Sequence, residues 1–144
     1  MTALPADLLL AVDHVGIAVA DMDEALAFYA ATFGLHAVHQ EVNEDQGVRE
    51  AMLAVGDGET QLQLLAPLTP DSLIARFLER SGPGLQQLAY RVADVVAASA
   101  VLRERGCRLV YDEPRPGTAG SQVNFVHPKD TGGVLVELVE PPTR

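Results

Sequence analysis

The chain has 144 residues, 48% of them apolar, and its 20 acidic and 10 basic side chains give a formal net charge of −10. No apolar run approaches the ~20 residues of a membrane-spanning helix, and the opening segment 1–7 lacks the basic start of a signal peptide. A net negative charge disfavours binding to the negatively charged backbone of nucleic acids. We therefore expect a soluble cytoplasmic protein that binds neither nucleic acid nor membranes.

The first half of the chain predicts one helix and four strands. Apolar and polar residues alternate over 12–19 around His14, which is typical of a strand with one buried face. Asp21 and Asp23 are both candidate caps for a helix that includes 24–33 and has Met22 on its apolar face, and Gly34 is a suitable end for it. Three further strands are expected over 35–42, 48–55 and 60–65.

The second half repeats this order after a short linker helix over 71–81. A strand over 85–92 leads to a capping Asp94 and a helix over 95–105. Strands are then predicted over 108–111, 122–126 and 134–139, with a Pro- and Gly-rich loop over 113–120. Val19-Ala20-Asp21 returns as Val92-Ala93-Asp94 at an offset of 73 residues, so the pattern indicates an internal duplication.

The predicted fold is α+β. Two tandem βαβββ modules, 10–66 and 85–140, form a curved mixed sheet around a central cleft. We expect them to make one domain over 10–144.

Four polar side chains interrupt strands that are otherwise built from apolar residues. They are His14, Gln63, Gln87 and Glu137, and Gln63 corresponds to Glu137 at an offset of 74 residues. Pairing the two modules about a pseudo-twofold axis would converge them on one cleft, where a nitrogen, two amide oxygens and a carboxylate suit a divalent metal ion. Taken singly, each residue can be a hydrogen-bonded structural group, and for either glutamine alone this is the favoured explanation.

This doubled module resembles the vicinal oxygen chelate superfamily, which includes glyoxalases, extradiol dioxygenases and the fosfomycin and bleomycin resistance proteins. Within it the chain resembles the methylmalonyl-CoA epimerases, and residues 41–53 are the most specific part of the likeness. The other similar segments are 13–19, 62–65, 111–114 and 127–130.

The resemblance implies an isomerase that epimerises 2-substituted malonyl-CoA thioesters in a homodimer. By resemblance, His14, Gln63, Gln87 and Glu137 bind the metal, with Co, Mn, Mg and Ni all suitable, and Glu50 is an acid/base residue. Inverting a carbon beside a thioester needs an acid/base group on each face. Glu50 and Glu137 are the two catalytic candidates, and the metal would stabilise the enolate.

Gln87 departs from this family, whose members usually carry a histidine there. An amide oxygen is a weaker donor than imidazole, so affinity for Co, Ni and Zn should fall. Three hypotheses stay open: a loosely held metal, a changed substrate, or a lost metal site. The last two include a non-catalytic ligand-binding protein and a repurposed biosynthetic enzyme.

The remaining chemistry-bearing residues have less specific roles. Cys107 is the only cysteine, which excludes an intrachain disulfide, and we expect it to pack as a small hydrophobe. His36 and His39 are three residues apart in a predicted strand, so they point to opposite faces and we expect surface or edge positions. His127 either shapes a turn or borders the cleft, and Lys129 is a weaker candidate for an anionic group. Arginines 103, 105 and 108 leave binding of a small anion open.

Overall fold

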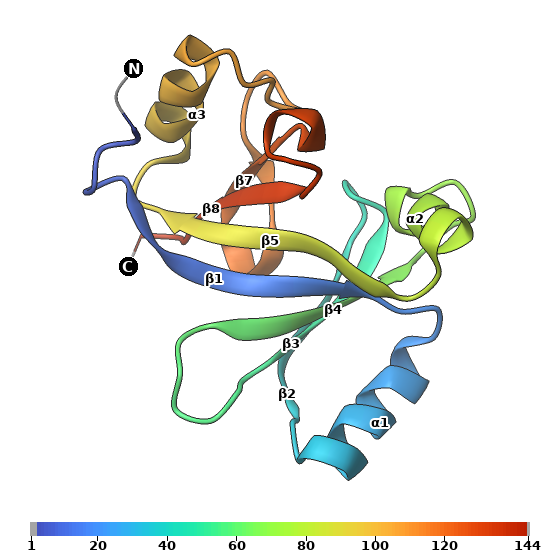
Figure 1. Cartoon of the computed structure of the whole chain (residues 1–144). Coiled ribbons are helices and arrows are strands. Elements are labelled where there is room, and N and C mark those ends of the chain that lie inside the picture. The colour runs from blue at the N-terminus through green and yellow to red at the C-terminus, as the bar shows by residue number, and fades with distance from the viewer. Residues whose placement is uncertain (1–2, 144) are drawn as a thin grey trace. The chain divides into compact units, whose positions relative to one another are not determined.

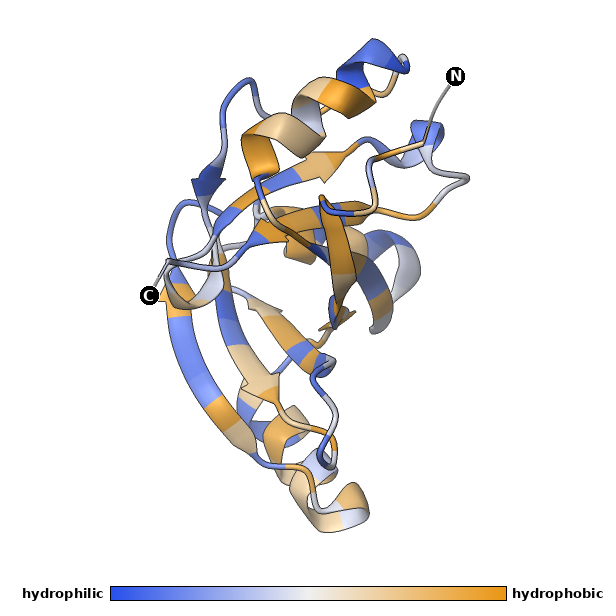
Figure 2. Ribbon diagram, turned by 90° about the vertical axis from the view of Figure 1, so that its left-hand side faces the viewer, coloured by the Kyte–Doolittle hydropathy of each residue, from blue (hydrophilic) through white to orange (hydrophobic). Residues whose placement is uncertain are grey.

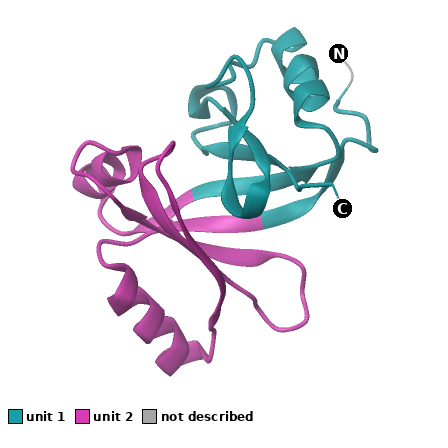
Figure 3. Ribbon diagram, turned by 180° about the vertical axis from the view of Figure 1, so that it is seen from behind, with its two compact units in different colours: residues 1–13, 87–144 teal, residues 14–86 magenta. Residues whose placement is uncertain are grey.

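The computed structural model describes residues 3–143. Residues 1–2 of the opening segment and residue 144 of the predicted domain lie outside the described residues. In each half of the chain one strand and one helix are followed by a run of strands, as expected for an α+β protein (Figure 1). They form two compact units (Figure 3): His14–Gln86 is one, and the segment from Gln87 onward joins the chain's start up to Asp13 in the other. Within the described residues no helix is both long and apolar enough to cross a membrane.

The unit His14–Gln86 contains a mixed sheet in the strand order β2-β3-β4-β1. β1 and β4 run parallel, whereas β2, β3 and β4 pair antiparallel. Its elements are β1 (Leu9–Ala18, whose first residues belong to the other unit), α1 (Met22–Phe33), β2 (Ala37–Asn43), β3 (Val48–Leu53), β4 (Gln61–Pro67) and α2 (Leu73–Ser81).

The two helices of this unit cover opposite faces of its sheet. Asp21 caps α1 by accepting a hydrogen bond from the Glu24 amide at 3.0 Å, and Gly34 ends the helix with a φ of 69°. The core against α1 contains Leu64, whereas the core against α2 contains Leu65. Because neighbouring strand residues point to opposite faces, α1 and α2 lie on different sides.

The other unit repeats the mixed pairing in the order β5-β8-β7-β6, with β5 and β8 parallel. Its core joins apolar residues of α3 to those of β5, β7 and β8, and Cys107 packs against this cluster as predicted. Figure 2 shows the mostly apolar colouring of α3, with a hydrophilic end. The elements are β5 (Gly84–Val92), α3 (Val95–Glu104), β6 (Arg115–Pro116), β7 (Gln122–Val126) and β8 (Val136–Glu140), with short 3₁₀ turns η1 (Thr118–Gly120) and η2 (Pro128–Asp130).

The strand predicted over 108–111 is wrong, because this segment makes a single bridge between Leu109 and Val126. The pairing of this segment with β7 stops at Tyr111, whose backbone groups bond to the Asn124 side chain and not to the backbone of β7. The Asn124 amide oxygen accepts from the Tyr111 N–H at 3.1 Å, and its nitrogen donates to the Tyr111 carbonyl at 2.9 Å. The edge strand is instead β6, inside the segment that the prolines had marked as a loop.

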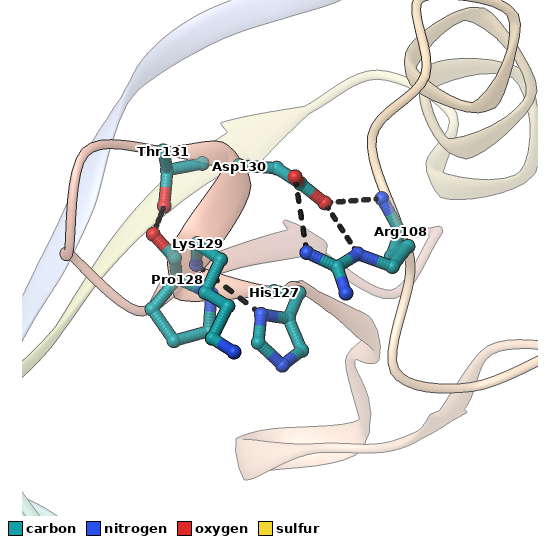
Figure 4. Close-up of polar contacts among 6 residues, drawn as sticks. All are labelled: Arg108, His127, Pro128, Lys129, Asp130 and Thr131. Carbon is teal, nitrogen blue, oxygen red and sulfur yellow. Dashed lines mark hydrogen bonds and ion pairs between the residues drawn. The ribbon is translucent and has the colours of Figure 1, made fainter.

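His127 shapes a turn, one of the two roles that the sequence left open. Its Nδ1 accepts a hydrogen bond from the Lys129 amide at 3.2 Å (Figure 4). The same turn carries Asp130, whose Oδ2 accepts from the Arg108 Nε at 3.0 Å. This guanidinium lowers the pKa of Asp130 from 3.8 to about 2, and the ion pair ties η2 to the segment after α3.

Candidate functional site

His14 and Gln63 lie on one face of the parallel pair formed by β1 and β4. Gly16 is opposite Gln63 in register. His14 comes two residues before Gly16 on the same strand, so its imidazole and the Gln63 amide are diagonal neighbours. Gly16 has no side chain to fill the space between them. Both polar side chains are buried, with exposures of 3% and 2%, and the structure therefore brings these two predicted ligands together.

Glu50 projects from the same face, one strand further along the sheet. It is opposite Leu65 on β4, and Met52, two residues later, is opposite Gln63. Paired residues point to one face of a sheet, so Glu50 and Gln63 are diagonal neighbours too. Glu50 is 2% exposed, which is rare for a carboxylate and costly without compensating partners. This burial is what an acid/base residue needs in order to work away from bulk water.

Gln87 and Glu137 form the matching pair in the other unit. Ala89 is opposite Glu137 across the parallel strands β5 and β8, and Gln87 precedes Ala89 by two residues. The Gln87 Nε2 donates a hydrogen bond to the Glu137 Oε1 at 2.8 Å. Both residues are buried, at 9% and 5% exposure. The structure thus joins the other two predicted ligands by direct contact.

The two pairs have the same construction. In each unit the first ligand comes from the first parallel strand, the second ligand comes from its parallel neighbour, and a small residue is opposite the second ligand. That small residue is Gly16 in one unit and Ala89 in the other. The duplication inferred from the sequence therefore extends to the register of the polar residues.

An ion pair adjoins the ligand position on β1. The Arg91 Nε donates to the Asp13 Oδ1 at 2.8 Å, and the two side chains are only 26% and 18% exposed. Asp13 immediately precedes His14. A partly buried charge-assisted hydrogen bond of this kind is strong. It therefore helps to hold β1 in place at the residue just before His14.

Two further polar residues, His39 and Glu41, lie on the site face of β2, where the sequence predicted a surface or edge position for His39 and no role for Glu41. β2 is indeed the edge strand of its unit. The His39 Nε2 lies 2.6 Å from the Glu41 Oε1, and Glu41 is opposite Glu50 in register. The available signal was the alternation His39-x-Glu41, which places both side chains on one face of a strand.

The turn before β7 is sterically restricted. A Cβ added to Gly117 would lie 2.4 Å from the Val123 Cγ1 and 2.6 Å from the Ser121 Oγ. Ala119 adopts a φ of 55°, and among the described residues it is the one non-glycine with a positive φ. Such backbone strain persists where the surroundings enforce a conformation, frequently at functional sites. The proline and glycine content of 113–120 signalled a loop but not this restriction.

The three arginines that left anion binding open each have protein partners. The Arg103 Nη2 donates to the Tyr111 and Asp112 carbonyls at 2.9 and 3.1 Å. The Arg105 Nη2 donates to the Ala3 carbonyl at 3.4 Å. With Arg108 held by its ion pair, all three arginines stabilise contacts within the unit that contains α3.

The predicted ligands fit a hard divalent cation in their chemistry. An imidazole, two amides and a carboxylate supply nitrogen and oxygen donors, and burial removes them from competing water. No three His, Cys, Asp or Glu side chains of residues 3–143 gather as a metal-binding group. The predicted set has just two residues of these types, His14 and Glu137, because its other members are amides.

Comparison with known proteins identifies the family. Residues 13–125 match the model of the Glyoxalase/Bleomycin resistance protein/Dioxygenase superfamily. The chain belongs to this superfamily. Methylmalonyl-CoA epimerase from Mycobacterium tuberculosis has a structure that matches it with a TM-score of 0.93 at 55% identity, covering 98% of this chain and 94% of that one. The α+β, glyoxalase-like fold predicted from the sequence is thereby confirmed.

Two other members of the superfamily are similar over nearly their whole length. A variant of the Streptomyces coelicolor methylmalonyl-CoA epimerase, in complex with 2-nitronate-propionyl-CoA, matches with a TM-score of 0.90 at 46% identity, covering 94% of this chain and 99% of that one. The ethylmalonyl-CoA/methylmalonyl-CoA epimerase of Cereibacter sphaeroides is 39% identical over 128 residues, which are 88% of this chain and 94% of that protein.

Proposed function

We propose that this protein is an epimerase of 2-alkylmalonyl-CoA thioesters, with methylmalonyl-CoA as a substrate. The observation that carries the proposal is the 55% identity to the Mycobacterium tuberculosis methylmalonyl-CoA epimerase, which covers 98% of this chain. The Cereibacter sphaeroides relative is named for both ethylmalonyl-CoA and methylmalonyl-CoA. That name extends the substrate class to a longer alkyl group.

The reaction in this proposal begins with proton transfer to Glu50. Its carboxylate removes the proton from the carbon between the thioester and the carboxylate; the C–H electron pair forms the C=C bond of the enolate, and the C=O π pair moves to the thioester oxygen. Return of a proton to the opposite face inverts the centre, and Glu137 is proposed as the group on that side. The burial of both carboxylates, at 2% and 5% exposure, keeps water from competing.

We also propose that His14, Gln63, Gln87 and Glu137 hold a divalent metal ion. Support comes from the donor chemistry, from the burial of all four side chains, and from the repeated register that pairs them within each unit. When bound, such an ion supplies Lewis-acid stabilisation of the negative charge on the thioester oxygen. The Gln87 amide orients the Glu137 carboxylate through their hydrogen bond.

Chromatographic analysis of the two epimers tests this function. A single epimer of methylmalonyl-CoA should become a mixture of both when the purified protein is added. Chelation should abolish the reaction, and added Co or Mn should restore it. Recovery of the unchanged starting epimer with every metal tried would support a non-catalytic binding protein instead. The homodimer and the cytoplasmic location stay predictions, and light scattering after size-exclusion chromatography checks the dimer.

A further inference from the structure

We infer that Glu41 and His39 form a proton path between the buried Glu50 and solvent. The inference rests on the proposed role of Glu50 as an acid/base residue. A carboxylate that takes a proton from a substrate must lose it again before the next turnover in the same direction. Glu50 is 2% exposed, so its own contact with water is minimal and it needs such a path.

Apolar side chains flank Glu50 along β3 and lie directly opposite it on β4, with the Gln63 amide as its diagonal neighbour. Val48 and Met52 flank it along β3, and Leu65 is opposite it on β4. These three residues are 2%, 6% and 3% exposed. Toward β4, therefore, the register places an aliphatic side chain that neither accepts nor donates a proton.

The residue opposite Glu50 on the other side is Glu41 of β2. Residues directly opposite in an antiparallel pair share a face, with Cβ atoms about 4.5–5.5 Å apart. Two carboxyl groups at that separation exchange a proton directly or through one water. Like charges so placed are destabilising when both are ionised, so the pair is best accommodated when a proton or a neighbouring cation offsets one charge.

His39 supplies the next group on the same face. Its Nε2 lies 2.6 Å from the Glu41 Oε1, a hydrogen-bonding distance, and the two side chains are 40% and 28% exposed. Exposure therefore rises from Glu50 to Glu41 to His39, which is on the edge strand of the sheet. Imidazole changes its charge near neutral pH and is suited to passing protons to water.

Other charged side chains of β3 are held away from this path. Arg49 is adjacent to Glu50 in the chain and points to the opposite face, where its Nη2 donates to the Asp23 Oδ1 of α1 at 3.1 Å. The charged groups that β2 and β3 bring together on the site face are thus His39, Glu41 and Glu50.

Each transfer in the path moves one proton and changes no oxidation state. The proton that Glu50 takes from the substrate carbon passes to the Glu41 carboxylate, and from there to the His39 Nε2. The imidazolium then releases its Nδ1 proton to water. In this scheme Glu41 and His39 do not contact the substrate, since they act through Glu50.

Chemical rescue of a His39→Ala variant tests the path, with His36→Ala as the control. His36 is an exposed histidine three residues earlier. We expect His39→Ala to lower kcat by roughly 10- to 100-fold, at or below the lower end of the range for a positioned acid/base group. KM should stay unchanged, and added imidazole should restore kcat with saturation. The His36→Ala variant should match the unmodified protein and gain nothing from imidazole.

A second variant, Glu41→Gln, keeps the side-chain shape and interrupts the path one step closer to Glu50. It should lower kcat to a similar extent. Added imidazole should not restore kcat, because imidazole replaces His39 and the interrupted transfer is the one from Glu50 to Glu41. Wild-type kcat in His39→Ala, or a loss that imidazole does not restore, overturns the path and leaves the proposed function standing. An unmodified protein that epimerises no malonyl thioester overturns both.

Discussion

Replacement of Gln87 by leucine removes the hydrogen bond that Gln87 donates to Glu137. Leucine is close to glutamine in size and has no donor, so the 2.8 Å bond between the Nε2 and the Oε1 is lost. Both residues are at least nine-tenths buried, and water cannot readily replace the donor. A hydrogen bond to a charged group contributes about 1.5–3 kcal/mol. The variant should therefore lose about that much unfolding free energy.

Urea denaturation of the metal-free protein measures this loss, and Gln86→Leu is the matched control. Gln86 is the neighbouring glutamine, and its buried Oε1 has no hydrogen-bond partner among the described residues. Gln86→Leu should lower the unfolding free energy by no more than about 0.5 kcal/mol. Equal effects of Gln86→Leu and Gln87→Leu would refute the assigned role of the Gln87 amide.

Three other predictions concern the metal, the restricted turn and the surface ion pair. Gln87→His should raise the affinity for Co and Ni in titration calorimetry, and an unchanged affinity would place this side chain away from the ion. Gly117→Ala should cost about 1–3 kcal/mol in urea denaturation, because its Cβ would lie 2.4 Å from a valine methyl on β7. Gly58→Ala, with an ordinary 3.5 Å contact, should cost far less. The carboxyl of Asp130 should titrate near 2 by NMR, and Arg108→Gln should return it toward 3.8. Because the pKa of Asp130 is lower in the folded state, the ion pair with Arg108 contributes fully to stability above about pH 4, and this contribution is lost as the pH falls through about 2.

The repeated pattern was sufficient to predict most of the helices and strands and the strands that carry the four polar residues. Capping residues and apolar spacing correctly predicted α1 and its end at Phe33, and the structure selects Asp21 over Asp23 as the N-cap, because local hydrogen bonds decide where a helix begins and ends. The offset between Gln63 and Glu137 correctly indicated equivalent positions. Strand periodicity assigns a side chain to one of two faces, so a polar residue in an apolar strand can be placed from sequence.

The apolar periodicity of the sequence could not predict contacts between segments that are distant in the chain. The segment 108–111 has a strand-like sequence, yet the Asn124 side chain takes over the hydrogen bonds at Tyr111 and ends the pairing. The position of Glu41 opposite Glu50 depends on the register between β2 and β3, and that register includes an irregularity between Ala37 and His39. Neither feature follows from local sequence.

Exchange of the substrate α-proton in deuterated water tests whether Glu50 removes that proton during epimerisation. With methylmalonyl-CoA and added Co or Mn, NMR or mass spectrometry should show deuterium entering the α-position together with epimerisation. Glu50→Gln, which keeps the size of this buried side chain and removes its basicity, should reduce exchange by about 10²- to 10⁴-fold while the protein stays folded. Exchange at the wild-type rate in Glu50→Gln would exclude Glu50 as the base, and no exchange in the unmodified protein would exclude the proposed epimerisation.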